Sequence, residues 1–268
     1  MKRLNKILLI TLCFFLVAGL SACIKKKQDK DLLRVVQERG KLIVGIKYDT
    51  KPFGFIDKDQ KLKGFDVDLA REIAKRILGD ENAVEFQQVT SSNRIFALTS
   101  GTVDLVAATM TITNKRQRII DFSRPYYIAG QAIMVKNDSP IKSLRDLANK
   151  KVIVVLGSTS EQNIKQFVPD VEILGFRTYT DAFNALKSGR GDALTTDDSI
   201  LIGFLSENPD FKMLNDKLTK EPYGLGFKKD EKTKSFQDTV DFVLQQIMQD
   251  GTLRKIQKKW TVDLINNK

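Results

Sequence analysis

The sequence predicts an α/β fold made of two lobes, and three observations lead to this expectation. Segments with the apolar patterns of strands and helices alternate from residue 41 to residue 109, which is typical of a parallel sheet covered by helices. A second series of the same kind begins near residue 132. No long stretch rich in proline or glycine separates the two series, so we expect short extended segments to connect the lobes.

The first series places short β-branched runs between helical repeats. The predicted strands are residues 41–46 (KLIVGI), 83–89 (AVEFQQV) and 103–109 (VDLVAAT). Apolar residues over 66–78 recur at helical spacing, and Gly79 is a typical helix stop. A hairpin tip is expected over 59–64 and a shorter helix over 91–100.

The second series repeats this alternation. Its predicted strands are residues 132–136, 151–157 and 171–176, and its predicted helices are residues 143–149 and 160–168. A helix, a turn and a strand are expected over 180–197, with the strand ending in DALTTD. Residues 223–230 then predict one more strand, and residues 233–260 are mostly helical.

The connections between the lobes are expected near residues 127–130 and 221–224, where two hinge strands cross. Two crossings return the last helices to the first lobe. We therefore expect lobe 1 to comprise residues 33–128 with 223–264, and lobe 2 to comprise residues 131–221. Ligands of α/β sheets bind beyond the carboxyl ends of the strands, so a cleft between the lobes is the natural binding site.

The N-terminus has the layout of a secretory signal peptide. Lys2, Arg3 and Lys6 precede a run of fourteen mostly apolar residues over 7–20, and the run is followed by small residues. Such a helix rises only about 21 Å, which is short of the roughly 30 Å hydrocarbon core of a bilayer. The string LSAC, which ends at Cys23, resembles the bacterial lipoprotein signal.

That similarity implies that residues 1–22 are a lipoprotein signal peptide and that Cys23 becomes the lipidated N-terminus. Residues 23–32 then form a flexible tether, and the chain is anchored to the extracytoplasmic side of the cell membrane, in a periplasm or on an outer surface. The alternatives are a plain membrane anchor, or a secreted protein in which this cysteine occurs by chance.

The composition excludes several classes of function. The chain has 268 residues and no histidine, so a histidine-based catalytic triad and a histidine zinc site are ruled out. Its formal charge is +11, but the basic residues are scattered and form no stripe with aromatic residues, which argues against nucleic acid as a partner. No cofactor or metal is expected. Cys13 lies in the segment to be removed, so Cys23 is left without an intrachain disulfide partner.

Several strings together resemble one known family. They are GFDVDLAREIAK, VDLVAATMTITNKRQRIIDFSRPYY, DALTTDDSILIGF and GTLRKIQKKW. Over about residues 42–260 the chain is similar to the polar amino-acid family (family 3) of bacterial extracellular solute-binding proteins, which serve ABC importers. The resemblance implies a two-lobed periplasmic-binding-protein-like fold of type II. It also implies a monomer that binds an amino acid without catalysis and delivers it to the membrane subunits of an ABC permease.

The string VTSSNRIFALTSGTVDL looks like the glutamate- and aspartate-binding members. The expected ligand is therefore free L-glutamate or L-aspartate. A glutamine binder, or a binder of another polar amino acid, is the first alternative. A dehydratase or a sensor module built on the same fold are the others.

The resemblance assigns the ligand's α-carboxylate to Arg116, whose planar guanidinium forms a bidentate fork, with Thr111 as an additional donor. Thr109 is expected to offer a backbone carbonyl or its hydroxyl to the α-ammonium. The family usually has proline or aspartate and then glutamate before this arginine, whereas this chain has Asn114 and Lys115. This departure changes how Arg116 is braced. The other interpretation is that Arg116 simply belongs to a charged helix start.

The second lobe is expected to contribute a carboxylate and a helix start. Asp197 follows the predicted strand and matches the ammonium-binding position of the family, with Asp198 as the competing residue. In the string GSTSE at 157–161, Thr159 and Ser160 are expected to contact the ligand at the start of a helix. The same string also fits a helix cap with a capping box, and both interpretations can hold.

The ligand's side chain is assigned to Arg94, Lys47 and Ser91. By resemblance, Arg94 faces the side chain in binders of acidic amino acids, Lys47 matches a basic position in several of them, and Ser91 adds a hydrogen bond. The competing interpretation is a surface arginine on a short helix and a lysine at a strand end. Phe53 and Tyr223 either line the site or belong to the core and the hinge.

Overall fold

The structure is a computed structural model, and it describes residues 31–216 and 218–262. The predicted signal peptide, Cys23, which is expected to carry a lipid, and most of the predicted tether lie outside the described residues. Each of the two main sheets has five strands and is covered by helices. Among residues 31–216 and 218–262, no helix combines the length and apolar character that a membrane span requires.

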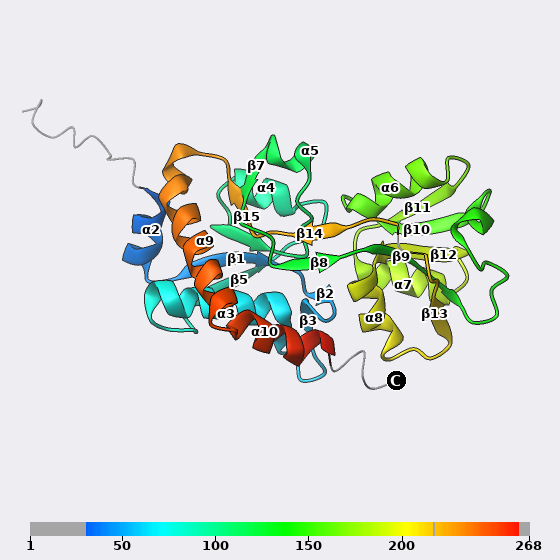
Figure 1. The fold of residues 1–268 in the computed structure, drawn as a ribbon, viewed down its shortest axis with the longest axis horizontal. Helices are drawn as coiled ribbons and strands as arrows, with labels where there is room; N and C mark the ends of the chain where they lie inside the picture. The colour runs from blue at the N-terminus through cyan, green and yellow to red at the C-terminus, as the bar shows by residue number, and fades with distance from the viewer. Residues whose placement is uncertain (1–30, 217, 263–268) are drawn as a thin grey trace, which may run out of the picture. The chain divides into compact units, whose positions relative to one another are not determined.

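The first sheet combines the early part of the chain with a strand from its end (Figure 1). Its order is β5 (Val84–Gln88), β1 (Leu42–Ile46), β6 (Leu105–Ala107), β15 (Gly226–Lys228) and β7 (Ile120–Phe122). The three strands β5, β1 and β6 are parallel, as the alternation predicts. Strand β15 runs antiparallel to β6 and β7, so the late segment returns to the first lobe as expected.

Helices α3 (Phe65–Leu78) and α9 (Lys234–Gln249) pack against each other beside this sheet (Figure 1). Leu69 and Ile73 of α3 are fully buried, and so are Val240 and Leu244 of α9. Gly79 ends α3 in a left-handed conformation at φ 84°, which glycine adopts without steric cost. The remaining helical segments of this lobe are α2 (Leu32–Arg39), α4 (Arg94–Thr99), α5 (Asn114–Gln117), η3 (Glu231–Thr233), α10 (Thr252–Gln257) and η4 (Lys258–Val262).

The second sheet has the order β11 (Glu172–Phe176), β10 (Lys151–Val155), β12 (Ala193–Asp197), β9 (Gln131–Lys136) and β13 (Phe211–Met213). Its helices are α6 (Thr159–Phe167), α7 (Tyr179–Lys187) and α8 (Asp198–Leu205). Strands β10, β11 and β12 are parallel, whereas β9 is antiparallel to both of its neighbours. A small sheet of β2 (Asp49–Thr50), β3 (Gly54–Ile56) and β4 (Leu62–Lys63) belongs to the first part of the chain.

Two expectations about secondary structure are wrong. The segment 143–149 is only a short 3₁₀ turn, η2 (Leu144–Leu147), because the Ser143–Asp146 capping box starts it and Asn149 turns left-handed at φ 60° directly afterwards. The single strand expected over 223–230 is two strands, β14 (Glu221–Tyr223) and β15. They pair with different partners, because β14 lies in the crossing and β15 lies in the first sheet.

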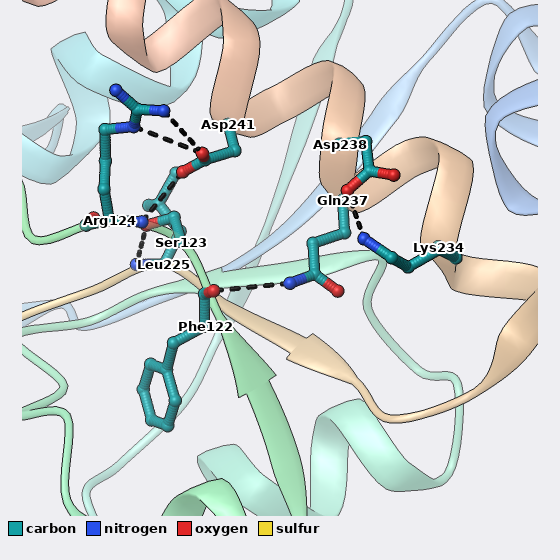
Figure 2. A network of polar contacts seen from close by, with 8 residues as sticks. All are labelled: Phe122, Ser123, Arg124, Leu225, Lys234, Gln237, Asp238 and Asp241. Carbon is teal, nitrogen blue, oxygen red and sulfur yellow. Dashed lines mark hydrogen bonds and ion pairs between the residues drawn. The ribbon is translucent and has the colours of Figure 1, made fainter.

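The two crossing strands are β8 (Tyr127–Ala129) and β14, and they pair with each other in an antiparallel ladder. The crossing is fastened to the first lobe at its base (Figure 2). There, the Ser123 N–H donates to the Leu225 carbonyl at 2.9 Å, and the Leu225 N–H donates to the Ser123 hydroxyl at 3.0 Å. Arg124 donates from its backbone and its guanidinium to Asp241 of α9 at 2.8 and 2.9 Å (Figure 2). These bonds fix the point at which both crossing segments leave the first sheet.

Candidate functional site

Three cationic side chains of the first lobe are buried close together. Lys47 and Arg94 are each 2% exposed, and Arg116 is 8% exposed. Lysine and arginine are rarely buried to this extent unless a partner compensates the charge. Burial is the main cause that lowers the pKa of Lys47 well below its ordinary value, and the nearby charge of Arg94 adds to it. The charge of Arg94 therefore acts on both Lys47 and Arg116.

The segment after β6 runs between these cations in a strained conformation. Thr109 has φ 45°, which is unusual for a β-branched residue. Its N–H donates to the carboxylate of Asp66 on α3 at 3.1 Å, and its hydroxyl accepts from Lys47 Nζ at 2.8 Å. Arg94 Nη1 donates to the carbonyls of Ala108 and Thr109 at 2.5 and 3.1 Å. Part of the Arg94 guanidinium is thus used to hold this segment.

Arg116 lies on the short helix α5, which the Thr113 side chain caps by accepting from the Arg116 N–H at 3.2 Å. Its Nη1 donates to the Thr111 carbonyl at 2.7 Å, and its Nη2 donates to the Gly157 carbonyl of the second lobe at 3.1 Å. Within the described part of the chain, Arg116 forms no salt bridge. Burial, followed by the like charge of Arg94, lowers its pKa to about 9. Among the residues that the structure describes, the hydrogen-bond acceptors of this guanidinium are therefore neutral carbonyls.

Asp197 of the second lobe ends β12 and occupies the N-cap position of α8, yet its side chain does not cap that helix. Its Oδ2 accepts from the Tyr223 hydroxyl. Its Oδ1 finds no hydrogen-bond partner in the described part of the chain, although the residue is only 5% exposed. Burial raises the pKa of Asp197 to about 6. Asp198 instead accepts from the Gly130 N–H at 3.2 Å, so the two neighbouring carboxylates have separate roles.

The start of α6 approaches the first lobe closely. Gly157 has φ 79°, and a Cβ placed there would lie 2.7 Å from Ser92 Cα and 2.8 Å from the Ser91 carbonyl oxygen. Ser158 caps α6 by accepting from the Glu161 N–H at 3.3 Å, while Glu161 accepts from the Gly157 N–H at 2.8 Å. The predicted cap is therefore present at Ser158, which leaves Thr159 and Ser160 in the first turn of the helix.

Five buried side-chain atoms among the described residues have no hydrogen-bond partner. They are Ser91 Oγ, Arg94 Nε, Ser160 Oγ, Asp197 Oδ1 and Ser199 Oγ. The two serines at 91 and 199 lie near tyrosine hydroxyls, whose pKa values they lower, so their polar environment is partly satisfied. A buried donor or acceptor without a partner costs about 1–3 kcal/mol. The unpaired Arg94 Nε donor and Asp197 Oδ1 acceptor point to a polar ligand that would complete them.

Further contacts join the two lobes around this polar group. The Asp49 carboxylate accepts from the backbone N–H of Tyr179, the first residue of α7, at 2.7 Å. A Cβ on Gly203 of α8 would lie 2.5 Å from the Lys51 carbonyl oxygen, so the two backbones touch at this point. The Tyr179 ring also lies under Lys47 Nζ, 4.4 Å from its centroid.

The structure buries all but one of the site residues expected from the sequence. Those that are buried are Lys47, Ser91, Arg94, Thr109, Thr111, Arg116, Ser160 and Asp197, and Thr159 is half-buried. The interpretation of Arg94 as a surface residue is wrong, because its side chain is enclosed. Phe53 is fully buried, and its ring packs edge-on against Tyr127 and Tyr223 at 5.1 and 5.4 Å.

Three buried residues that bond to or contact the predicted site residues were not expected from the sequence: Asp66, Tyr126 and Tyr179. Asp66 accepts from Thr109 and from the Tyr126 hydroxyl, and burial raises its pKa to about 6. Tyr179 comes from the second lobe and meets Lys47. An aspartate in the apolar face of the predicted helix over 66–78 was a usable signal for Asp66, because a carboxylate there is costly unless it is paired. No comparable signal marks Tyr126 or Tyr179.

The family described as bacterial extracellular solute-binding proteins, family 3, matches residues 42–263 of the chain. The chain is 41% identical to the ABC transporter glutamine-binding protein GlnH of Bacillus subtilis, over 97% of each protein. It is 48% identical to a glutamine-binding protein of Geobacillus stearothermophilus, over 75% of this chain and 77% of that protein. The glutamate-binding protein GluB of Corynebacterium glutamicum is 33% identical, over 82% and 78%.

Solved structures of amino-acid-binding proteins are similar to this chain in fold. An ancestral arginine-binding protein bound to glutamine has a TM-score of 0.77 at 43% identity and covers 82% of this chain and 97% of its own. The cysteine-binding protein of Campylobacter jejuni has a TM-score of 0.83 at 31% identity, over 87% and 94%. The expected two-lobed fold of type II is confirmed by these neighbours.

Proposed function

The chain belongs to the bacterial extracellular solute-binding proteins of family 3, and on this premise we propose that it is the binding component of an amino-acid ABC importer with glutamine as its ligand. The relatives and fold neighbours described above are solute-binding proteins rather than enzymes. Glutamine replaces the glutamate or aspartate expected from the sequence, because the two relatives with the higher identities, 48% and 41%, are named for glutamine. The protein named for glutamate is 33% identical.

The observation that carries this proposal is the combination of a buried unpaired cation and a buried half-paired anion. Within residues 31–216 and 218–262, the Arg116 guanidinium donates to carbonyl oxygens alone, and one carboxylate oxygen of Asp197 has no hydrogen-bond partner. A free amino acid brings one carboxylate and one ammonium, and so supplies the counter-charge that each residue lacks. Burial of either ligand charge would cost several kcal/mol without such pairing.

The α-carboxylate is assigned to the guanidinium of Arg116 and to Thr111, which together offer a fork and a hydroxyl donor. Thr111 is 4% exposed, and its carbonyl already accepts from Arg116. The first turn of α6 adds Thr159 and Ser160 from the second lobe. The Ser160 hydroxyl is buried and has no partner.

The α-ammonium is assigned to Asp197 Oδ1, with Thr109 as a second acceptor. A carboxylate in this role must be ionised, and its pKa of about 6 leaves it mostly ionised at pH 7. Because the carboxylate acceptor belongs to the second lobe and the Arg116 donor to the first, the ligand bridges the lobes. Closure of the lobes then gains free energy only from contacts that the ligand makes with both.

The side chain of the ligand is assigned to Lys47, Arg94 and Ser91. Two carbonyls already occupy Arg94 Nη1, and Asp66 lies close enough to contribute a counter-charge to Arg94. Burial lowers the pKa of Lys47, and its Nζ already donates to the Thr109 hydroxyl at 2.8 Å. An uncharged carboxamide can accept from these donors, so glutamine fits without adding a charge.

Glutamate is the second candidate, and the third buried cation favours it. If Lys47 is charged, the site holds three cations against the carboxylates of Asp66 and Asp197, and a γ-carboxylate would balance them. The ranking of glutamine and glutamate therefore depends on the charge of Lys47.

Titration calorimetry of residues 24–268 with each of the twenty amino acids at pH 7.5 tests the proposal. We expect glutamine to bind most tightly, with glutamate and aspartate at least tenfold weaker. Tighter binding of glutamate or aspartate than of glutamine would reject glutamine as the ligand. If no amino acid binds, the proposal of an amino-acid-binding component is wrong.

We further propose that a lipid on Cys23 anchors the chain outside the cytoplasm, which raises its effective concentration near a membrane permease. A Cys23→Ala variant should appear in the culture medium or the released periplasmic fraction, whereas the unaltered chain should sediment with membranes. Equal release of both forms would contradict the anchor. Uptake of labelled glutamine should fall in cells that lack the protein, and unchanged uptake would argue for a sensor role.

A further inference from the structure

Tyr223 is the last residue of the crossing strand β14, and its backbone is bonded to the first lobe on both sides. Its carbonyl accepts from the Tyr126 N–H at 2.9 Å. It forms an isolated antiparallel bridge with Thr111, and the next residue, Gly224, donates to the Met110 carbonyl at 3.1 Å. The crossing strand is therefore tied to the segment that presents Thr111.

The side chain of the same tyrosine reaches the second lobe. Its hydroxyl donates to Asp197 Oδ2, and the residue is fully buried. The ring has little freedom, because it packs edge-on against Phe53 at 5.4 Å and stacks on Tyr127 at 5.6 Å. One residue thus joins the crossing strand, the segment of the first lobe that includes Thr111, and the carboxylate of the second lobe.

The environment of Asp197 explains why this donor matters. Burial and the nearby carboxylates of Glu221 and Asp198 raise the pKa of Asp197, whereas Lys47 and the hydrogen bond from Tyr223 lower it. The other charged or titratable groups that interact with it are Arg94, Arg116, Tyr127 and Tyr179. Among the described residues, the Tyr223 hydroxyl is the one hydrogen-bond donor to this carboxylate.

The local structure supports a special role as well. An aspartate at an N-cap position ordinarily accepts from the backbone of its own helix. Asp197 does not do so, although it precedes α8. Its carboxylate is held by a residue 26 positions away in the sequence, and this leaves Oδ1 without a partner inside the site.

We propose that Tyr223 is a positioning residue, which orients Asp197 so that Oδ1 faces the ligand ammonium and which keeps this carboxylate ionised when the lobes are in contact. This inference rests on the proposed function. It makes the crossing strand part of ammonium recognition, because movement of β14 relative to β12 would change the direction and the charge of Asp197.

The alternative is that Tyr223 only fills the apolar core of the crossing. Tyr223→Phe separates the two roles, because phenylalanine keeps the ring and removes the donor. Tyr127→Phe is the matched control, since Tyr127 stacks on the same ring and has no hydrogen bond to Asp197. Circular dichroism and thermal unfolding establish that both variants are folded.

The first measurement needs no ligand. The carboxyl carbon of Asp197 is titrated by carbon-13 NMR, with its resonance assigned by its loss in Asp197→Asn. A hydrogen bond to a charged group is worth about one to two pH units when it is expressed as a pKa shift. We expect the Asp197 midpoint to move upward by that amount in Tyr223→Phe and to move little in Tyr127→Phe. An unchanged midpoint in Tyr223→Phe would overturn the inference.

The second measurement uses glutamine binding in a double-mutant cycle. At pH 7, Tyr223→Phe should weaken binding about ten- to a hundredfold in the native background, and the loss should shrink as the pH rises to 9. In the Asp197→Asn background the same change should cost less than threefold, because its target is absent. An equal loss in both backgrounds would assign Tyr223 to packing alone. If glutamine does not bind the unaltered chain, the proposed function fails, and the carboxyl titration still decides this inference.

Discussion

Arg116 offers a quantitative test, because its charge is buried without an anionic partner in the described chain. We predict that Arg116→Met strongly weakens amino-acid binding and leaves the fold intact. The guanidinium donates to Thr111 and Gly157, and it is 8% exposed. Methionine has a similar length and keeps the apolar part of the contact, but it supplies neither the charge nor the fork.

The size of the effect follows from the burial of this group. Truncation of one partner of a buried, hydrogen-bonded charge pair costs about 2–5 kcal/mol. Since 1.4 kcal/mol is a tenfold change, the dissociation constant should rise by a factor of about 30 to several thousand. Arg116→Lys keeps the charge and loses the bidentate geometry, so it should fall between the native chain and Arg116→Met.

Calorimetry and thermal unfolding measure this loss independently. Ligand at about 100 times its dissociation constant stabilises the native chain by about 2.7 kcal/mol, which corresponds to a rise in Tm of about 5–10 °C. At the same ligand concentration, Arg116→Met should gain less than about 3 °C. Arg118→Ala is the matched control, because Arg118 is exposed and directly follows the same short helix.

A Tm shift in Arg116→Met as large as that of the native chain would refute the reasoning, since Arg116 would then not supply the counter-charge of the carboxylate. A comparable loss in Arg118→Ala would also refute it, because general charge would then explain the result.

Three further predictions concern the contacts between the lobes and the buried carboxylates. Asp49→Ala removes the carboxylate that accepts from the Tyr179 N–H across the lobes. Calorimetry should show that the affinity for every amino acid that binds falls about three- to thirtyfold, and a loss confined to one ligand would contradict this prediction. Gly203→Ala should weaken binding more than tenfold by calorimetry, because its Cβ would meet the Lys51 carbonyl oxygen at 2.5 Å where the lobes touch. Native affinity in this variant would contradict the lobe contact. Burial raises the pKa of Asp66 to about 6 in the folded chain, so as the pH falls the native state takes up a proton at this carboxylate before the unfolded state does, and the free energy of unfolding rises between about pH 6 and 4. Urea unfolding should show a smaller rise in Asp66→Asn, and an identical rise would contradict the raised pKa of Asp66.

The regular elements were predictable because their signals are local. Helix α3 was expected over 66–78 and begins one residue earlier, and Gly79 ends it as expected. The division of 223–230 into β14 and β15 was not predictable, because it depends on which distant strands each half meets. The 3₁₀ turn η2 was also missed, since its end depends on the left-handed conformation of Asn149.

Family resemblance selected candidate residues that the structure buries, but it did not reveal the hydrogen bonds among them. The sequence identified Arg94 but gave no sign that its guanidinium holds the carbonyls of Ala108 and Thr109. The contact between Tyr223 and Asp197 joins two lobes, and sequence spacing carries no information about it. The proposal of glutamine as the ligand rests on the relatives that are named for glutamine, which the patterns of this sequence do not supply.

A crystal structure of the chain with bound glutamine would test the central claim most directly. We predict that a carboxylate oxygen of the ligand lies within about 3.2 Å of the Arg116 guanidinium, which is the ordinary limit of a hydrogen bond. The ligand ammonium should lie within the same distance, about 3.2 Å, of Asp197 Oδ1. A bound amino acid whose ammonium does not contact Asp197, or whose carboxylate does not contact Arg116, would contradict the account.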